Sequence, residues 1–246
     1  MDLNWTRLAV AAAGGAALAL WFRVGRPAGG FSHSGNASSF VPLNADELPA
    51  DPYDLLKSWM ADAEKASGFL EAHAMTLATS DSDGGATART VVLQLAGEEH
   101  GGLVFGSNRF SLKARQATAD SRVEAVLRFG QRQARVRGTL RIDDTKAAVS
   151  FGRVAPRARL GLTTLEQGHA TDEAGHAKVV AQIDELMAKG HEQNIAEPPS
   201  NYTAFVLTPK SFEFYNGGHP AYINDRFLYL RASGGTGFAT PLRLQA

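Results

Sequence analysis

The chain has 246 residues, of which 44% are hydrophobic, so it can bury a sizeable core as one large domain or two small ones. Its 25 basic and 25 acidic side chains balance, which excludes a general attraction to nucleic acid or anionic membranes. It has no cysteine, which excludes disulfides, thiolate nucleophiles and cysteine-ligated metals.

An uncharged run near the N-terminus, residues 8–22, reads "LAVAAAGGAALALWF". It is shorter than the roughly 18 to 20 apolar residues with which a helix crosses a bilayer. Its flanks lack the basic start and small-residue cleavage site of a convincing signal peptide. A weak anchor, a poor signal and an extension outside the fold remain open. We favour the extension, which predicts a cytoplasmic protein.

A linker is predicted at residues 24–50, which are rich in Gly, Ser, Pro and Asn and show no apolar period. Residues 1–50 are therefore expected to form an apolar segment and a flexible linker, and residues 51–246 the folded domain. That domain opens with a helix in "DPYDLLKSWMADAEKA", because Asp51 is a good N-cap and Pro52 suits the first helical position.

Short strand-like runs fill residues 74–138, with hairpin signals at 83–85 and 101–102. A segment of helical composition, "SLKARQATADS", interrupts them. Two further helices are predicted at residues 143–151 and 178–189, the second amphipathic and followed by Gly190.

The segments "YTAFVLTPKSFEFY" and "AYINDRFLYLR" return to strands near the C-terminus. Because strands and helices do not alternate regularly, we predict an α+β fold that is mainly β, a small antiparallel barrel with helices in its connections. No G-x-G-x-x-G follows a strand, which disfavours a parallel dinucleotide-binding fold.

Two basic sites come first. Arg89 opens the apolar strand "ARTVVLQL", where a surface arginine is the favoured interpretation of this residue taken alone. In "FGSNRFSLKARQ", Ser107 ends a strand, and Ser111 and Lys113 begin a helix. Hydroxyls, free N–H groups at a helix start and a lysine suit a phosphate monoester, but an ordinary capped helix with a solvated lysine stays open.

Two further sites suggest a flat ligand. Gln133 and Gln167 each offer a donor and an acceptor, which could match the edge of a heteroaromatic ring. Tyr215 and Arg226 flank the last hairpin and could supply an aromatic wall and a second cation. Taken singly, each glutamine is more often a surface residue, and Arg226 could be a surface arginine of an ordinary hairpin.

Six segments follow one another in a distinctive order and carry all of these residues except Gln167. They are "DPYDLLKSWMADA", "AMTLATSDSDGGATARTVVL", "GLVFGSNRFSLKARQ", "RVEAVLRFGQRQARVRG", "SFEFYNGG" and "NDRFLYLR". In this order, from about Asp51 to its end, the chain resembles the pyridoxamine 5'-phosphate oxidase family, including its relatives in phenazine biosynthesis. The resemblance implies an FMN-binding split β-barrel with flanking helices, and a homodimer that binds FMN at the subunit interface.

By position, the resemblance implies ten FMN-binding residues. They are Arg89, Thr90, Val91, Val92, Ser107, Lys113, Gln133, Gln167, Tyr215 and Arg226. Leu112 stands where the family has the first cation of an Arg-Lys pair, Gly168 replaces a serine, and Tyr215 replaces a tryptophan.

The substrate site departs further from the family. Gln94 replaces a lysine, and the positions of a phosphate-binding Tyr, Arg and Ser carry Ser150, Val154 and Ala158. An Arg-x-His pair becomes Tyr222 and Asn224. We expect Gln94, Tyr222 and Asn224 to contact the substrate. Arg153, Arg157 and Arg159 remain open as shifted replacements for the lost cations.

Each lost charge-assisted contact is worth roughly 1.5 to 3 kcal/mol, so we predict that the substrate has changed. The resemblance then implies an FMN-dependent oxidase that passes electrons from a small flat dihydroaromatic or amine substrate to O2, as in phenazine-type secondary metabolism. The flavin N5 carries the chemistry and no catalytic side chain is required. A genuine pyridoxamine 5'-phosphate oxidase and a non-catalytic flavin-binding or haem-type module are the alternatives.

Three consecutive residues of the last hairpin are expected to have different roles. Asn224 would contact the substrate, Asp225 would support the fold, and Arg226 would contact FMN, with a salt bridge from Asp225 to Arg226 as the alternative. Metal catalysis is disfavoured, because the seven histidines show no H-x-x-x-H or comparable spacing.

Overall fold

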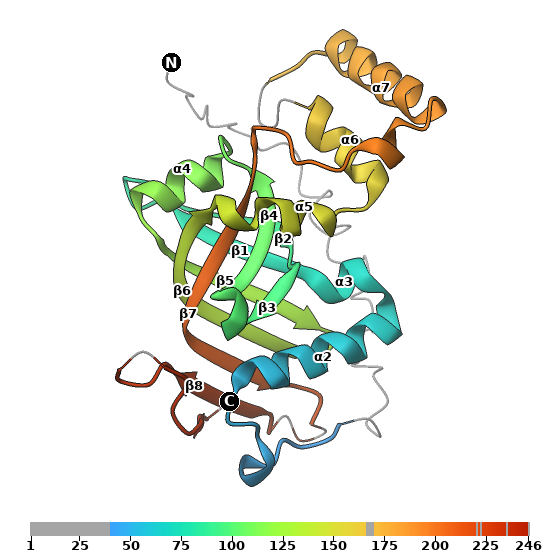
Figure 1. The fold of residues 1–246 in the computed structure, drawn as a ribbon. Coiled ribbons are helices and arrows are strands. Elements are labelled where there is room, and N and C mark those ends of the chain that lie inside the picture. The colour runs from blue at the N-terminus through green and yellow to red at the C-terminus, as the bar shows by residue number, and fades with distance from the viewer. Residues whose placement is uncertain (1–39, 166–169, 220, 222, 235, 246) are drawn as a thin grey trace, which may run out of the picture. The chain divides into compact units, whose positions relative to one another are not determined.

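The structure is a computed structural model that describes residues 40–165, 170–219, 221, 223–234 and 236–245. Residues 40–246 form one structural unit. Figure 1 shows a curved antiparallel sheet with helices in its connections. No helix in the described ranges is long and apolar enough to cross a membrane.

The helix predicted after Asp51 is confirmed as α2 (Pro52–Ser67), which is followed by α3 (Phe69–His73). The Asp51 side chain accepts a hydrogen bond from the Tyr53 N–H at 2.9 Å, and Pro52 lies in the first turn, where it costs no helical hydrogen bond. One face of α2 is buried against the sheet, where Trp59 meets Phe214 edge to face at 5.2 Å.

In the part of the chain that the structure describes, nine strands form the sheet, and every neighbouring pair is antiparallel. They are β1 (Ala74–Ser80), β2 (Ala86–Val92), β3 (Leu95–Gly97), β4 (Gly102–Asn108), β5 (Arg122–Phe129), β6 (Arg132–Asp143), β7 (Tyr202–Asn216), β8 (Asp225–Leu230) and β9 (Leu242–Arg243). The main order is β2-β1-β5-β6-β7-β4-β3, and β8 and β9 extend from β7. The sheet curves without closing between β2 and β3.

The turn chemistry follows the prediction at the first hairpin. Gly84 joins β1 to β2 with φ 87°, a conformation that a residue with a side chain rarely adopts. The segment predicted to be helical after β4 forms α4 (Leu112–Ala119).

In its described residues, the long connection from β6 to β7 holds three α-helices. They are α5 (Ala147–Gly152), α6 (Pro156–Thr164) and α7 (Glu173–Ala188). The helix predicted from Asp143 starts later, because Asp143 still pairs within β6 and Asp144 is held by Arg109 and Thr203 at 2.7 and 2.6 Å. The amphipathic helix starts earlier than predicted, because Asp172 caps it by accepting from the Gly175 N–H at 2.8 Å.

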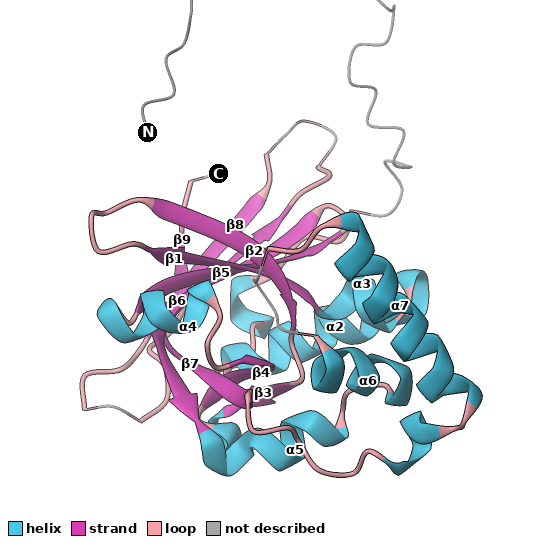
Figure 2. Cartoon of the chain, turned by 90° about the horizontal axis from the view of Figure 1, so that it is seen from above, coloured by secondary structure: helices cyan, strands magenta, loops and turns pink. Residues whose placement is uncertain are grey.

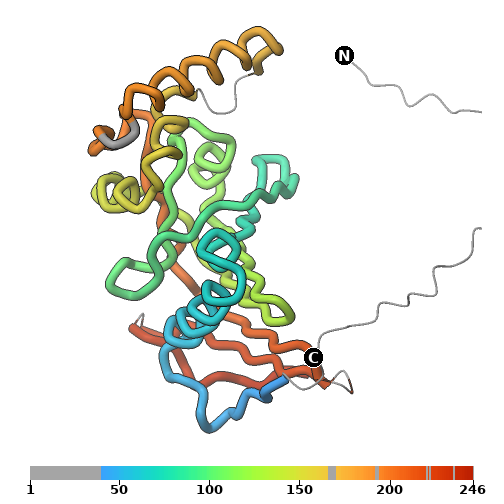
Figure 3. Tube along the Cα trace, turned by 90° about the vertical axis from the view of Figure 1, so that its right-hand side faces the viewer, coloured from blue at the N-terminus to red at the C-terminus, as the bar shows by residue number. Residues whose placement is uncertain are grey.

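The core lies on the concave side of the sheet. Buried side chains of β1, β5, β6 and β7 meet α2 there, including Leu77, Val136 and Phe212. Figure 2 shows α2, α3, α6 and α7 gathered on one side of the strands, with α4 apart from them. Figure 3 shows residues 40–49 beside the C-terminal strands.

Candidate functional site

Arg89 projects from β2 toward α4 and donates only to neutral groups. Its guanidinium reaches Thr79 Oγ1 at 2.6 Å, Thr87 Oγ1 at 3.1 Å and Gln116 Oε1 at 2.9 Å. Burial lowers the pKa of Arg89, and the charge of Asp81 opposes that shift. Asp81 hydrogen-bonds Gln116 instead of pairing with the guanidinium.

Lys113, in the first turn of α4, is a second cation beside Arg89. Its Nζ donates to Ser107 Oγ at 2.8 Å. Burial and the charge of Arg89 together lower the pKa of Lys113 to about 8. In the described part of the chain, neither cation forms an ion pair with a carboxylate. A dianion bound between them would relieve their repulsion, and a phosphate monoester is such a group.

Ser111, the N-cap of α4, adds a buried hydroxyl without a partner. It makes no capping bond, and its Oγ has no hydrogen-bond partner within the described ranges. An unsatisfied buried hydroxyl is costly, and the first N–H groups of a helix also lack intrahelical partners. We call Arg89, Ser107, Ser111 and Lys113 the cation cluster. Its geometry fits the phosphate of a cofactor.

The three residues that follow Arg89 alternate across the sheet. Val91 packs against the core on the same side as Arg89, whereas Thr90 and Val92 are exposed on the opposite side. The predicted contacts of this strand are therefore divided between the two faces.

Gln133, Tyr215 and Arg226 form a row across three strands. Gln133 on β6 is the register partner of Tyr215 on β7, which is the partner of Arg226 on β8. All three are half-buried. Arg226 also donates to Glu213 Oε2 at 3.0 Å. We call these three residues the cross-strand row, and the fold brings them together from distant parts of the sequence.

The cation cluster and the cross-strand row lie on opposite faces of the sheet. Arg89 is the register partner of the buried Leu77. Gln133 instead shares the outer face with Thr90, and both line a cavity of about 400 Å³. One ligand can touch both groups only by passing round the open edge of the sheet or by lying between two copies of the chain.

Gln94, Ser150 and Tyr202 form a second polar cluster, which carries no charge. The Ser150 hydroxyl donates to Gln94 Oε1 and lies 2.8 Å from the Tyr202 hydroxyl. Because Ser150 has one proton to donate, Tyr202 must donate to Ser150 Oγ. Burial raises the pKa of Tyr202 against the opposing hydrogen bonds, so the phenol stays protonated. We call these three residues the neutral network.

Gly106 on β4 provides the space for the neutral network. A Cβ at this position would lie 1.6 Å from the Tyr202 hydroxyl oxygen and 2.6 Å from Ser150 Oγ. Any side chain here would push the phenol out of place.

The three arginines of the segment "RVAPRAR" have different surroundings. Arg159 supports the backbone, because its guanidinium donates to the carbonyl oxygens of Val154, Ile195 and Gly152 at 2.9, 2.8 and 2.9 Å. Arg153 and Arg157 are exposed and form no ion pair with any described residue. Arg159 is thereby occupied, and Arg153 and Arg157 remain available to an anion.

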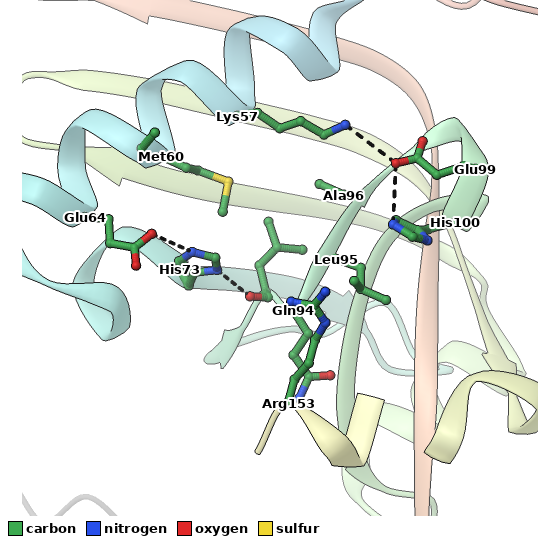
Figure 4. Close-up of a pocket in the computed structure, with 12 residues that line it drawn as sticks. Lys57, Met60, Glu64, His73, Gln94, Leu95, Ala96, Glu99, His100 and Arg153 are labelled. Atoms are coloured by element: carbon green, nitrogen blue, oxygen red, sulfur yellow. Dashed lines mark hydrogen bonds and ion pairs between the residues drawn. The ribbon is translucent and has the colours of Figure 1, made fainter. Parts of the chain in front are cut away.

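Arg153 lines a cavity of about 310 Å³ beside Gln94, with α2 and the β2–β3 connection as the other walls (Figure 4). We call it the Arg153 cavity. Its two carboxylates already have partners: Glu99 lies 3.6 Å from Lys57, and Glu64 lies 3.8 Å from His73.

The position of Asp225 rules out its pairing with Arg226. Asp225 accepts from the Leu43 N–H at 2.8 Å and from Arg243 at 2.7 Å, whereas Arg226 pairs with Glu213. The alternative assignment of Asp225 as the partner of Arg226 is therefore wrong, because adjacent strand residues point to opposite faces. Burial alone would raise the pKa of Asp225, but these hydrogen bonds lower it.

The remaining predicted residues are placed in part. Asn224 is half-buried, and its Oδ1 accepts from the His219 N–H at 3.3 Å. Val154 packs beside Phe151, and Ala158 is exposed. Gln167 and Tyr222 lie outside the described residues. Sequence reasoning missed Tyr202, and a tyrosine at the start of a predicted strand gave no local signal of its contact with Ser150.

Comparison with curated proteins identifies relatives over most of the chain. The pyridoxine/pyridoxamine 5'-phosphate oxidase of Rhodopirellula baltica is 31% identical over 193 residues, which cover 77% of this chain and 84% of the relative. The enzyme of the same name from Microcystis aeruginosa is 31% identical over 197 residues, covering 79% and 89%. No family model matches the chain.

Two solved structures share the fold. PhzG from Burkholderia lata 383, in complex with tetrahydrophenazine-1-carboxylic acid, has a TM-score of 0.69 and 23% identity over 85% of this chain and 98% of its own. A pyridoxamine 5'-phosphate oxidase-related, FMN-binding protein from Nostoc punctiforme has a TM-score of 0.61 and 18% identity, covering 81% and 99%. They confirm the predicted antiparallel split barrel with flanking helices, whose sheet stays open here.

Proposed function

The chain belongs to the pyridoxine/pyridoxamine 5'-phosphate oxidase family of FMN-binding oxidoreductases, and from that premise we propose that it is an FMN-dependent oxidase of a small flat substrate that is not a phosphorylated pyridine. The observation that carries the proposal is the contrast between the cation cluster and the neutral network. The first provides two cations for a cofactor phosphate, and the second provides no cation for a substrate phosphate.

The cation cluster would bind the FMN phosphate. Arg89 and Lys113 supply charge, Ser107 and the unpartnered Ser111 supply hydroxyls, and α4 presents its N-terminus. The cluster lacks the first cation of the Arg-Lys pair, since Leu112 is exposed at that position. The two remaining cations match the charge of a phosphate dianion.

The cross-strand row would hold the ring end of FMN from a second copy of the chain. Its location on the opposite face from the cation cluster supports a homodimer with FMN between the subunits. Gln133 offers a donor and an acceptor to a ring edge, Tyr215 offers a flat wall, and Arg226 offers a charge. Gln167, Thr90, Val91 and Val92 are proposed as further contacts.

FMN, when bound, supplies the two-electron redox chemistry, and O2 is the proposed acceptor. The chain contributes binding, alignment and polarisation of the ring. No side chain is required as a strong base, and the neutral network, with its phenol kept protonated by burial, could not act as one.

The substrate would lie near Gln94, with Tyr222 and Asn224 as the other proposed contacts. A flat, partly reduced ring of the kind bound in the PhzG structure suits a site whose polar cluster of Gln94, Ser150 and Tyr202 carries no charge. This would place the protein in secondary metabolism. The oxidation of pyridoxamine 5'-phosphate is the second candidate, which the names of the relatives and the exposed Arg153 favour.

The test is anaerobic reduction of the FMN-loaded protein. We expect a dihydrophenazine carboxylate to bleach the visible flavin absorption faster than pyridoxamine 5'-phosphate at equal concentration, and air to restore it with release of peroxide. The reverse order of rates would favour the second candidate. A protein that binds no FMN would contradict the proposal. Reduced flavin that persists in air would indicate a flavin-binding protein without oxidase activity.

A further inference from the structure

The neutral network fixes which atoms of Gln94 face the Arg153 cavity. Gln94 Oε1 accepts from Ser150, whose oxygen in turn accepts from Tyr202. The Gln94 side chain also hydrogen-bonds the Tyr202 phenol. Because the phenol donates its proton to Ser150, it accepts from Gln94 Nε2, which leaves one N–H of the amide. Since Gln94 also lines the cavity, that second N–H is the donor that remains for a ligand there.

The charges of the cavity leave one cation without a partner. Lys57 pairs with Glu99, and Glu64 lies next to His73, whose Nδ1 is 2.7 Å from the Leu93 carbonyl oxygen. Arg153 lies alongside Gln94 in Figure 4 and forms no ion pair with a described residue. The end of the cavity formed by Gln94 and Arg153 therefore presents only N–H donors and one net positive charge.

We propose that Gln94 and Arg153 form a subsite for a single carboxylate on the substrate ring, and that Ser150 and Tyr202 are positioning residues that hold the Gln94 amide in its donating orientation. This inference rests on the proposed function, because it names the substrate class of the same site. The apolar side chains of Met60, Leu93 and Leu95 in the same cavity would contact the ring.

A carboxylate fits this end better than a phosphate monoester does. One guanidinium and one amide match the charge and the two oxygens of a carboxylate. A phosphate dianion would bring two negative charges into a cavity whose wall already holds Glu64 and Glu99. The cation cluster, which is the proposed site for the FMN phosphate dianion, differs from this cavity because it has two cations and no paired acid.

The experiment compares phenazine-1-carboxylate with phenazine, which share one ring system. Both are titrated into the FMN-loaded protein, and binding is followed by the change in flavin absorption. We expect the wild-type protein to prefer the carboxylate by about tenfold or more, as one charge-assisted contact predicts. Arg153→Ala should reduce the preference to about twofold or less. Arg157→Ala, at an exposed arginine of the same segment, should leave it unchanged.

Two variants test the orientation of Gln94. Gln94→Glu keeps the shape but replaces the N–H donors with a charged oxygen, so phenazine should then bind more tightly than its carboxylate. Tyr202→Phe removes only the hydroxyl and should lower the preference several-fold while leaving the affinity for phenazine unchanged. An unchanged preference in either variant would overturn the positioning role.

The binding of FMN is measured first in every variant, which separates this inference from the proposed function. If FMN binds and the wild-type protein shows no preference for the carboxylate, the subsite is wrong while the cofactor assignment stands. If pyridoxal 5'-phosphate binds more tightly than phenazine-1-carboxylate and Arg153→Ala abolishes that binding, the subsite takes a phosphate and the proposal fails.

Discussion

The cation cluster and the neutral network lie along the same stretch of chain, since Arg89 belongs to β2 and Gln94 follows its end. Their chemistry is opposite. In the cluster, two half-buried cations lie together and Ser111 Oγ has no described partner. In the network, the hydroxyls of Ser150 and Tyr202 are satisfied by each other and by Gln94.

The difference separates two kinds of polar site. A cluster with uncompensated charge is costly until a ligand arrives, so it marks a place that binding completes. A network that satisfies itself costs little without a ligand, and it acts by fixing the orientation of the atoms at its edge. Four substitutions or conditions can break or sharpen this contrast.

The largest effect is expected from removal of a cluster cation. Arg89→Met should weaken FMN binding by about 100-fold or more, because it removes charge-assisted hydrogen bonds worth roughly 1.5 to 3 kcal/mol each. A fluorescence titration with FMN measures the change. Arg115→Met, at an exposed arginine of α4 that donates to the Phe110 carbonyl oxygen, is the matched control and should bind FMN normally. Equal affinities in the two variants would contradict the cluster.

Gly106→Ala should damage the network instead. The new Cβ would overlap the Tyr202 hydroxyl, so the free energy of unfolding should fall by about 1 to 3 kcal/mol. Denaturant unfolding measures this. Gly152→Ala is the control, because no heavy atom lies within 4 Å of its added Cβ. A loss no larger than that of the control would mean that the phenol is not confined as described.

A change of pH should affect the cluster through Lys113. Its pKa of about 8 means that the protein without FMN loses this proton above pH 8, and a bound dianion would restore it. FMN binding then takes up a proton, so affinity should fall about fivefold between pH 8 and 9 and change little through this group below pH 8. Lys113→Met should remove the dependence. A wild-type affinity that is constant from pH 7 to 9 would contradict the pKa.

The smallest effect is expected from Tyr202→Phe. Loss of one hydroxyl from the network should lower the free energy of unfolding by about 0.5 to 1.5 kcal/mol and leave FMN affinity unchanged. Thermal unfolding and the FMN titration measure the two quantities. A drop in FMN affinity as large as that of Arg89→Met would show that the two regions are not separate.

Local features of the fold could be predicted because their causes are local. The α2 helix follows from its cap at Asp51 and from its apolar face, and the first hairpin follows from Gly84. The boundaries near Asp143 and Asp172 could not be predicted, since they depend on pairing within the sheet and on one cap. The N-terminal charges of "DDTKAAVSF" predict a helix start equally well at several positions.

The sites divide in the same way. Ser107 and Lys113 could be proposed as a phosphate site, because their residue types and their position at a helix start point to it. Arg89 joined them through the resemblance, and the phosphate role of all three stays a prediction. The roles of Arg153 and Arg159 could not be ranked from sequence, since Arg159 is occupied in part by the carbonyl oxygen of Ile195, which is 36 residues away. In the sequence, Ser150 is distinguished only because it stands where the family has a phosphate-binding tyrosine. Its partner Tyr202 lies on a strand 52 residues away, and no local pattern records that contact.

The Asp225 contacts have a consequence for the order in which the chain folds. Asp225 holds the backbone of Leu43 across 182 residues of sequence, and Arg243, close to the C-terminus, reaches both of them. During synthesis, residues 40–49 could therefore pack against Asp225 and Arg243 only after nearly the whole chain has been made. A truncation that removes the last strand should release this early segment to proteolysis while β1 to β7 stay protected.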